Sequence, residues 1–205
     1  MIAIIDYGVG NLFSLCSSFS FIGKDAVITN DEKVIADSER IILPGVGAFE
    51  DAAKKLRESG MADTVRSEVK KGKPLLGICL GMQLLFDKSF EYGEHEGLSL
   101  INGNVVPMSN VIPPELKIPQ IGWNALHFPK DKPKSRLFKY IEENEHVYFV
   151  HSYYAADCEK DTIATTEYGA EITAAAAYEN VFGTQFHPEK SGNTGLNILR
   201  AFCEL

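Results

Sequence analysis

Short apolar runs alternate with helical patterns through the first half of the chain. Runs rich in Ile, Leu and Val predict buried strands, at Ile2–Ile5, Ala26–Thr29, 41–43 and 74–78. Amphipathic helices are predicted between them, at residues 12–22, 49–56 and 61–71, with Asn11 as a cap and Gly23 and Gly60 as stops. Because parallel strands need crossovers and short apolar strands suit a sheet covered on both faces, this half predicts a doubly wound arrangement.

The second half is richer in strands. They are predicted at residues 147–150, 163–166, 173–178 and 181–185, with a final helix at 194–202. A two-residue turn at Glu179 and Asn180 predicts a hairpin, since Asn tolerates positive φ. The proline-rich stretch 110–134 is expected to be a surface excursion. We therefore predict a single-domain α/β three-layer sandwich over residues 1–205, with a mostly parallel central sheet and antiparallel additions.

Composition narrows the possible partners. The chain has 205 residues, is 45% hydrophobic and carries a formal charge of −8, which argues against a duplex nucleic-acid binder. It opens without a basic segment, so no signal peptide is expected, and no apolar run approaches the roughly 20 residues of a membrane span. A cytoplasmic protein without membrane contact is predicted. The four cysteines show no zinc or disulfide spacing, so no metal is expected and at most one cysteine does chemistry.

The most specific motif is Gly77-Ile78-Cys79-Leu80-Gly81, which follows the strand 74–78 and opens a helix predicted through Met82, Leu84 and Leu85. It is a cysteine version of G-x-S-x-G, in which glycines permit a strained strand-to-helix turn that exposes the middle residue. The helix dipole and free N–H groups there favour the thiolate. Cys79 is therefore the predicted nucleophile. Cys16 and Cys203, on apolar helix faces, are expected to be core residues.

A thiolate that attacks a carbonyl needs an acid and base, and His187 is placed for that role. It lies at a strand end in Gln185-Phe186-His187-Pro188-Glu189, where Glu189 can orient the imidazole. His151 ends another strand and is the rival base, but no carboxylate follows it closely. The other three histidines, His95, His127 and His146, are expected to be surface or packing residues.

The oxyanion formed by such an attack needs N–H donors. The residue after the nucleophile, Leu80, supplies one, and the glycine-rich loop Pro44-Gly45-Val46-Gly47 supplies a second from Val46 or Gly47. Gly8-Val9-Gly10 follows the first strand, but the third glycine of a dinucleotide fingerprint falls on Phe13. No nucleotide or other cofactor is therefore expected, and Asn11 is assigned to an exposed loop.

Taken together, these residues resemble the class I, triad-type glutamine amidotransferase family. The general motifs are residues 77–83, with Met82 and Gln83 completing the cysteine turn, and 185–189. Within that family the chain is similar to the glutaminase subunits of imidazole glycerol phosphate synthases. The sequence segments that carry this likeness are residues 4–12, 44–49, 121–124, 151–153 and Lys190-Ser191, with Ile121 where Met is expected.

The resemblance implies a role for each matching residue. Cys79 attacks the side-chain amide of glutamine, His187 protonates the departing ammonia and activates water, and Glu189 orients His187. Gln83, and backbone around Ser152 and Tyr153, help to hold the glutamine.

The resemblance also implies a partner, a cyclase subunit with a (β/α)8-barrel fold that uses the ammonia in histidine biosynthesis. It makes imidazole glycerol phosphate and aminoimidazole carboxamide ribotide. Asn11, Trp123 and Lys190 are predicted to lie at that interface, because they flank strand ends and have no place in the hydrolysis. A flip of the Gly45–Val46 peptide is predicted to complete the oxyanion hole only when the partner is loaded.

Two other interpretations stay open at this point. One is a glutaminase subunit of another synthase, such as anthranilate, aminodeoxychorismate or pyridoxal phosphate synthase. Those lack the opening at residues 7–11 and the Lys190. The other is a non-enzymatic α/β binding module, in which Cys79 is an inert core residue and resists an electrophilic glutamine analogue.

Overall fold

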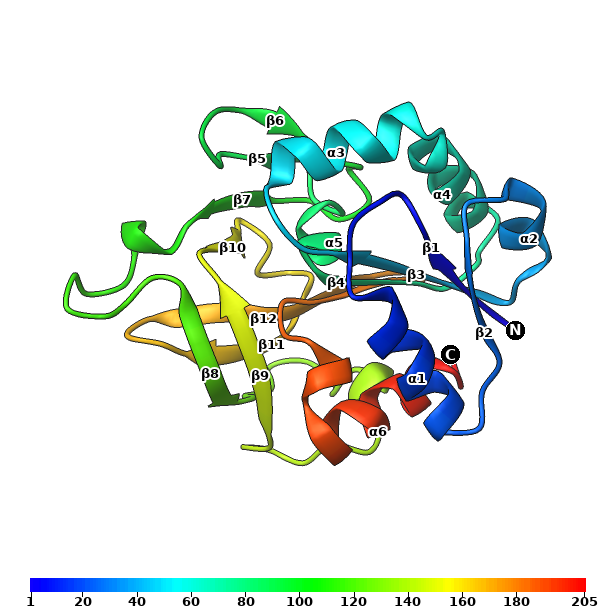
Figure 1. Ribbon diagram of the computed structural model, residues 1–205. Helices are drawn as coiled ribbons and strands as arrows, with labels where there is room; N and C mark the ends of the chain where they lie inside the picture. Colours follow the sequence, from blue (N-terminus) through cyan, green and yellow to red (C-terminus); the bar gives the residue numbers. More distant parts are fainter.

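A seven-stranded sheet runs through the middle of the protein in the computed structural model, which describes residues 1–205 (Figure 1). Its strands are β1 (Ile2–Ile5), β2 (Ala26–Thr29), β3 (Arg40–Gly45), β4 (Leu75–Cys79), β11 (Thr162–Glu167), β12 (Glu171–Tyr178) and β13 (Val181–Thr184). Their order is β11-β12-β13-β4-β3-β1-β2. The five strands from β13 to β2 are parallel, and β12 is antiparallel to both of its neighbours. The predicted fold class is confirmed.

Helices cover both faces of this sheet. In Figure 1, α1 (Leu12–Phe21) and α6 (Gly192–Phe202) lie below it, and α3 (Phe49–Glu58) and α4 (Met61–Lys70) lie above it. Alternate residues of β1 point to the two faces of the sheet. Ile4 packs in the apolar cluster that includes Leu15 of α1, and Ile5 packs in the cluster that includes Phe49 and Leu56 of α3. Because both faces of β1 are buried, its sequence is apolar without a polar alternation.

Two smaller sheets stand beside the central one. Strands β5 (Lys88–Ser89), β6 (His95–Glu96), β7 (Asn104–Pro107) and β10 (Tyr153–Ala156) form a sheet in the order β10-β7-β5-β6. Strands β8 (Gln120–Ala125) and β9 (His146–His151) form an antiparallel pair. The prediction of a surface excursion at 110–134 is therefore wrong in part, because β8 lies inside it. The short helices are α2 (Glu32–Asp37), α5 (Leu80–Gln83), η1 (Met108–Asn110), η2 (Arg136–Phe138) and η3 (Pro188–Lys190).

Several local expectations need correction. Asn11 stands at the N-cap of α1, but its side chain makes no capping hydrogen bond. The helix after Cys79 ends at Gln83, before the expected Leu85. The turn between β12 and β13 has two residues as predicted, yet the positive φ, 52°, falls on Glu179. Asn180 instead donates two hydrogen bonds from its amide to backbone carbonyls, which explains why an amide is needed there. No helix has the length and apolar character to cross a membrane.

Candidate active site

The backbone at Cys79 is strained in the way that its flanking glycines predict. Cys79 ends β4 with φ 54° and ψ −112°, and α5 begins at the next residue. A Cβ on Gly81 would lie 1.9 Å from the carbonyl oxygen of Leu43, and one on Gly77 would lie 2.6 Å from that of Gly81. The turn is thus too tight for a side chain at either glycine. This close packing holds Cys79 in a conformation that costs about 1–3 kcal/mol.

His187 reaches Cys79 because their strands are neighbours. Strand β13 pairs in parallel with β4, so the residues that follow the two strands emerge at the same edge of the sheet. The Nδ1 atom of His187 lies 2.8 Å from Oε1 of Glu189, and both side chains are at most 2% exposed. The hydroxyl of Ser191 donates to the backbone carbonyl of His187 over 2.6 Å. The imidazole is therefore held from two sides, by a carboxylate and through its own backbone.

The surroundings of His187 favour its charged form. Burial opposes protonation of the ring, but hydrogen bonding with Cys79 and Glu189 and the charges of both outweigh it and raise the pKa of His187 to about 9. Nε2, on the side of the ring away from Glu189, is buried without an aligned hydrogen-bond partner. An imidazolium next to a cysteine sulfur stabilises the thiolate, so the pair is poised for nucleophilic attack.

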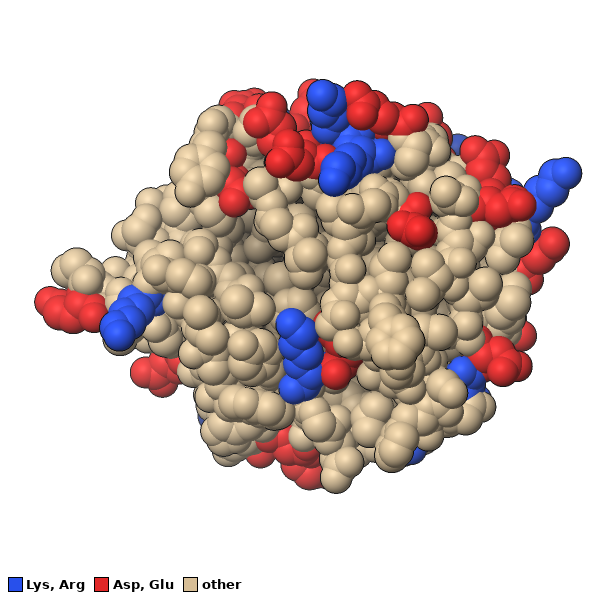
Figure 2. Space-filling model, viewed as in Figure 1, with Lys and Arg blue, Asp and Glu red and all other residues tan.

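A cavity of about 410 Å³ joins these residues to most of the predicted site. Predicted residues in its lining are Val46, Gly47, Cys79, Leu80, Gln83, Ser152, Tyr153, His187 and Lys190, together with the rival base His151. Figure 2 shows that the face viewed in Figure 1 is hollowed near its centre, with a basic side chain just below the hollow and most other charged side chains toward the edge of the molecule. The volume suits a small polar molecule the size of an amino acid.

Two further residues of this cavity, Glu91 and Pro119, have no signal in the sequence. Glu91 belongs to the loop between β5 and β6, and its carboxylate accepts a hydrogen bond from the backbone N–H of Phe49 over 2.6 Å. It places a negative charge in the cavity lining at the start of α3. The strands on either side of Glu91 have only two residues each, too short for a periodic pattern to show.

The loop at the end of β3 is braced from below. The buried hydroxyl of Tyr7 donates to the carbonyl of Pro44 over 2.7 Å, and a Cβ on Gly10 would lie 3.0 Å from the Pro44 ring. A Cβ on Gly45 would lie 2.6 Å from the N–H nitrogen of Gly81, so this loop also packs on the nucleophile turn. Tyr7 and Gly10 therefore support the predicted oxyanion loop. Gly8 packs against nothing, and its φ of 85° accounts for the glycine there.

His151 is the alternative base, and its contacts favour His187 for that role instead. Its Nδ1 lies 2.8 Å from the carbonyl oxygen of Tyr153, and its Nε2 lies 3.1 Å from Oε1 of Gln120. Burial, assisted by the nearby His187, lowers the pKa of His151 to about 4 despite the hydrogen bond with Tyr153. A neutral ring carries one N–H, which donates to the Tyr153 carbonyl, and neither nitrogen meets a carboxylate, so the contacts favour a place for His151 in the wall of the cavity.

The low pKa of His151 predicts an acid-sensitive fold. The histidine of the unfolded chain titrates near pH 6.5, whereas His151 of the folded chain is protonated only near pH 4. Between these two pH values the unfolded chain binds one more proton than the folded chain. Stability from this group is complete above pH 6.5 and is lost as the pH falls toward 4, by about 3 kcal/mol. Urea unfolding of the wild type and of His151→Gln at pH 7 and pH 4.5 measures this. The variant loses less stability on acidification, and equal losses contradict the assignment.

The three predicted interface residues lie outside the reacting centre. Trp123 of β8 is 53% exposed, and its ring meets that of Tyr148 edge to face, with centroids 6.1 Å apart. Nζ of Lys190 lies 5.9 Å from the centroid of the same Tyr148 ring. Asn11 is half-buried at the start of α1, which packs beside η3. The structure thus brings Trp123 and Lys190 onto one aromatic residue, and only Lys190 also lines the cavity.

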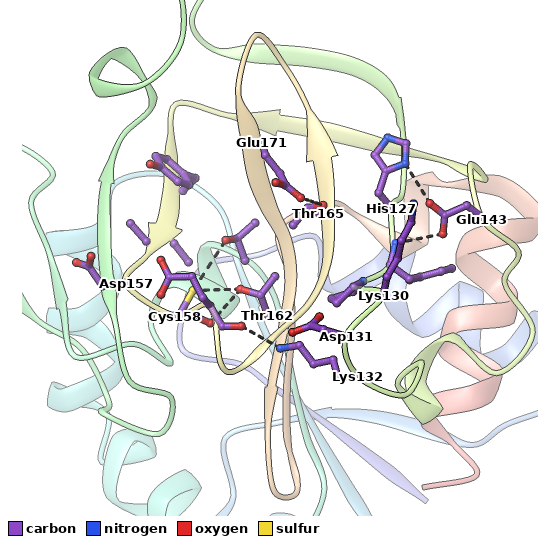
Figure 3. Close-up of a pocket in the computed structure, with 17 residues that line it drawn as sticks. His127, Lys130, Asp131, Lys132, Glu143, Asp157, Cys158, Thr162, Thr165 and Glu171 are labelled. Carbon is purple, nitrogen blue, oxygen red and sulfur yellow. Dashed lines mark hydrogen bonds and ion pairs between the residues drawn. The ribbon is translucent and has the colours of Figure 1, made fainter.

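A larger cavity, about 740 Å³, lies elsewhere and lacks a catalytic arrangement (Figure 3). Its polar groups already pair with each other, as His127 does with Glu143 and Thr165 with Glu171. Its cysteine, Cys158, contacts a threonine hydroxyl at 3.6 Å, and burial raises its pKa, which disfavours a nucleophile. No cluster of three or more His, Cys, Asp or Glu side chains is arranged to hold a metal ion.

Comparisons with known proteins show which family this chain belongs to. Residues 3–204 match the family Glutamine amidotransferase class-I. The Imidazole glycerol phosphate synthase subunit HisH of Caldanaerobacter subterraneus subsp. tengcongensis is 54% identical over 100% of this chain and 98% of its own length. The protein of the same name in Sulfurimonas denitrificans is 50% identical over 100% of this chain and 98% of its own.

Solved structures support the fold alone. A glutamine amidotransferase crystal structure has a TM-score of 0.76 at 18% identity, covering 100% of this chain and 98% of that one. PurLQS from Thermotoga maritima has a TM-score of 0.75 at 20% identity, covering 99% and 97%. The family match and the high identity over the full length of the relatives decide the assignment. The chain belongs to the class-I glutamine amidotransferase family and, within it, to the HisH subunits of imidazole glycerol phosphate synthase.

Proposed function

We propose that this chain hydrolyses the side-chain amide of glutamine through a thioester on Cys79 and passes the ammonia to a cyclase subunit in histidine biosynthesis. One observation carries the chemistry: a cysteine on a strained strand-to-helix turn shares a cavity with a buried histidine whose Nδ1 lies 2.8 Å from a carboxylate. The family assignment supplies the substrate and the kind of partner. The whole chain, residues 1–205, acts as one glutamine amidotransferase domain.

The reaction proceeds in two halves. The Cys79 sulfur attacks the amide carbon of glutamine, and the C–N bond breaks as His187 gives its proton to the departing nitrogen. Ammonia leaves and a γ-glutamyl thioester remains. His187 then takes a proton from water, the resulting hydroxide attacks the thioester, and the C–S bond breaks to release glutamate. Glu189 keeps the imidazole in the tautomer that both halves need.

Backbone N–H groups receive the negative charge that develops on the carbonyl oxygen. Leu80 supplies one, and Val46 or Gly47 supplies the second after the Gly45–Val46 peptide turns toward the cavity in the loaded complex. Gly47 has φ 98°, and Val46 is 42% exposed, which gives this end of the loop freedom that the braced Pro44 end lacks. A crystal structure of the isolated chain with the Val46 N–H already directed at the bound substrate contradicts the proposed turn.

The rest of the cavity holds the amino-acid end of glutamine. Gln83 and the backbone of Ser152 and Tyr153 bind its polar atoms, and the Glu91 carboxylate suits its α-ammonium group. No metal or cofactor takes part in this scheme.

The partner docks over the cavity mouth as a heterodimer, and its (β/α)8 barrel receives the ammonia. Ammonia released into neutral water becomes ammonium and loses its nucleophilic lone pair, so direct transfer is needed. Trp123, Lys190 and Asn11 form part of this interface. Trp123 is a large exposed aromatic residue seated on Tyr148, the kind of side chain that anchors interfaces.

Trp123→Ala is expected to weaken the complex about 30-fold, the effect of an interface hot spot of about 2 kcal/mol. Lys190→Ala and Asn11→Ala are expected to reduce binding or activation with the fold intact. Titration calorimetry with the cyclase subunit measures affinity, and thermal unfolding checks the fold. Wild-type affinity and activation in all three variants contradict the interface.

The function is tested by glutamate release from glutamine. The purified chain is assayed alone, with the cyclase subunit, and with that subunit loaded with its ribonucleotide ligand. We expect a low rate alone that rises sharply in the loaded complex. A high rate alone that ignores the cyclase contradicts the coupling, and no release in any mixture contradicts the glutaminase itself.

A further inference from the structure

Gln185 contacts the nucleophile, and the mechanism above leaves it unused. It follows β13 and has no exposed surface. Its Nε2 lies 3.8 Å from the sulfur of Cys79, and its Oε1 lies 3.0 Å from Nε2 of Gln83. Gln83 in turn lies 3.1 Å from the carbonyl oxygen of Tyr153 through the same Nε2. A buried chain of hydrogen bonds thus runs from a backbone carbonyl to the reacting sulfur.

The orientation of both amides follows from the first link of that chain. A backbone carbonyl oxygen only accepts hydrogen bonds, so the atom of Gln83 that faces Tyr153 is its NH₂ group. That NH₂ group only donates, so Gln185 presents its oxygen to Gln83. The other end of the Gln185 amide, its NH₂ group, is therefore left facing the sulfur of Cys79. Through the amides of Gln83 and Gln185, the Tyr153 carbonyl therefore fixes an N–H donor toward the sulfur of Cys79.

We infer that Gln185 is a positioning residue that stabilises the Cys79 thiolate by donating an N–H to its sulfur. This inference rests on the proposed function, in which that thiolate is the nucleophile. A hydrogen bond to a charged acceptor is stronger than one to a neutral acceptor, so the bond favours the thiolate over the thiol. His187 supplies charge to the sulfur, and Gln185 supplies a neutral donor that never competes for the proton. The carbonyl oxygen of Val150, 3.9 Å from the sulfur, accepts a hydrogen bond only from the thiol and opposes both.

The first test is the pH dependence of Cys79 alkylation by iodoacetamide, followed by mass spectrometry of the Cys79 peptide. Gln185→Met keeps a long unbranched side chain and removes the donor. We expect the midpoint of the alkylation profile to move up by about one pH unit, so that the rate below the midpoint falls about tenfold. Thr184→Val is the matched control, because Thr184 is a neighbouring buried polar residue whose hydroxyl has no partner. Its profile should superimpose on that of the wild type.

A second measurement does not depend on whether a Gln185 variant folds. In the wild-type chain, the side-chain amide NMR signals of Gln185 should titrate with the same midpoint as Cys79 alkylation, and this titration should vanish in Cys79→Ala. An unmoved alkylation profile in folded Gln185→Met, or Gln185 amide signals that do not follow Cys79, overturns the inference. Failure of the proposed function gives a different result. If Cys79 is not the nucleophile, it is alkylated no faster than an ordinary thiol, both in the wild type and in Gln185→Met.

Discussion

Cys79→Ala is expected to release no measurable glutamate from glutamine in the loaded complex, with kcat at least about 10⁴-fold below the wild type. Loss of the nucleophile removes the covalent route, and substitutions in catalytic groups that act as one unit cost up to about 10⁶-fold. The fold should survive, because the change removes one atom from a buried residue. Glutamate release with the cyclase subunit and its ligand measures the effect.

The control for this substitution is Cys203→Ala. Cys203 is also buried, at the end of α6, and it packs in the apolar cluster below the sheet. We expect its glutaminase rate to stay near that of the wild type. Glutamate release by Cys79→Ala that approaches the rate of the control would remove Cys79 from the mechanism.

Gly81→Ala is expected to destabilise the protein by more than about 4 kcal/mol or to prevent folding. Its Cβ would lie 1.9 Å from the carbonyl oxygen of Leu43 and 3.1 Å from the carbonyl carbon of Pro44, so the backbone of β3 or of the nucleophile turn must move. Gly81 is helical, where alanine alone would favour the fold by about 1 kcal/mol. Urea or thermal unfolding measures the net loss.

Gly72→Ala separates this steric effect from backbone strain. Gly72 has φ 94°, and a Cβ there would have nothing within 4 Å. The substitution is expected to cost about 1–2 kcal/mol, the penalty of a left-handed alanine. If Gly81→Ala costs no more than Gly72→Ala, the tight packing of the nucleophile turn is not what holds Cys79 in place.

The juxtaposition of Cys79, His187 and Glu189 was predictable because its signals are local in sequence. Cys79 stands between glycines at the end of an apolar strand, and Glu189 follows His187 by two residues. These patterns depend on strand ends, which the apolar runs mark well. The parallel pairing of β4 and β13 then brings together residues more than a hundred positions apart.

Strand β8 was missed because its pattern is inverted. Gln120 is fully buried and hydrogen-bonded to His151, whereas Ile121 and Trp123 are 61% and 53% exposed. Alternation with polar residues inside and apolar residues outside does not predict a strand that packs on a core. The inversion has a reason in the proposed function, since the exposed side chains of β8 face the docking partner and the buried amide supports the cavity wall.

The contacts of Gln185 and Glu91 could not be predicted from the sequence, for a different reason. The contacts of Gln185 are with residues 102 and 106 positions away, and Glu91 meets Phe49 across 42 positions. No spacing rule connects such pairs before the fold is known. Helix α2 was also not predicted, although Asp31, which accepts a hydrogen bond from the backbone N–H of Lys33, is an ordinary capping signal that could have indicated it.

If Cys79 carries the γ-glutamyl group during the reaction, an electrophile shaped like glutamine must trap that residue. The chain, loaded with its cyclase partner, is treated with an electrophilic glutamine analogue and examined by peptide mass spectrometry. We expect one adduct, on Cys79, whose formation is slowed by excess glutamine, with Cys16, Cys158 and Cys203 unmodified. An adduct on another cysteine, or no adduct under conditions in which the chain is folded and bound, contradicts it.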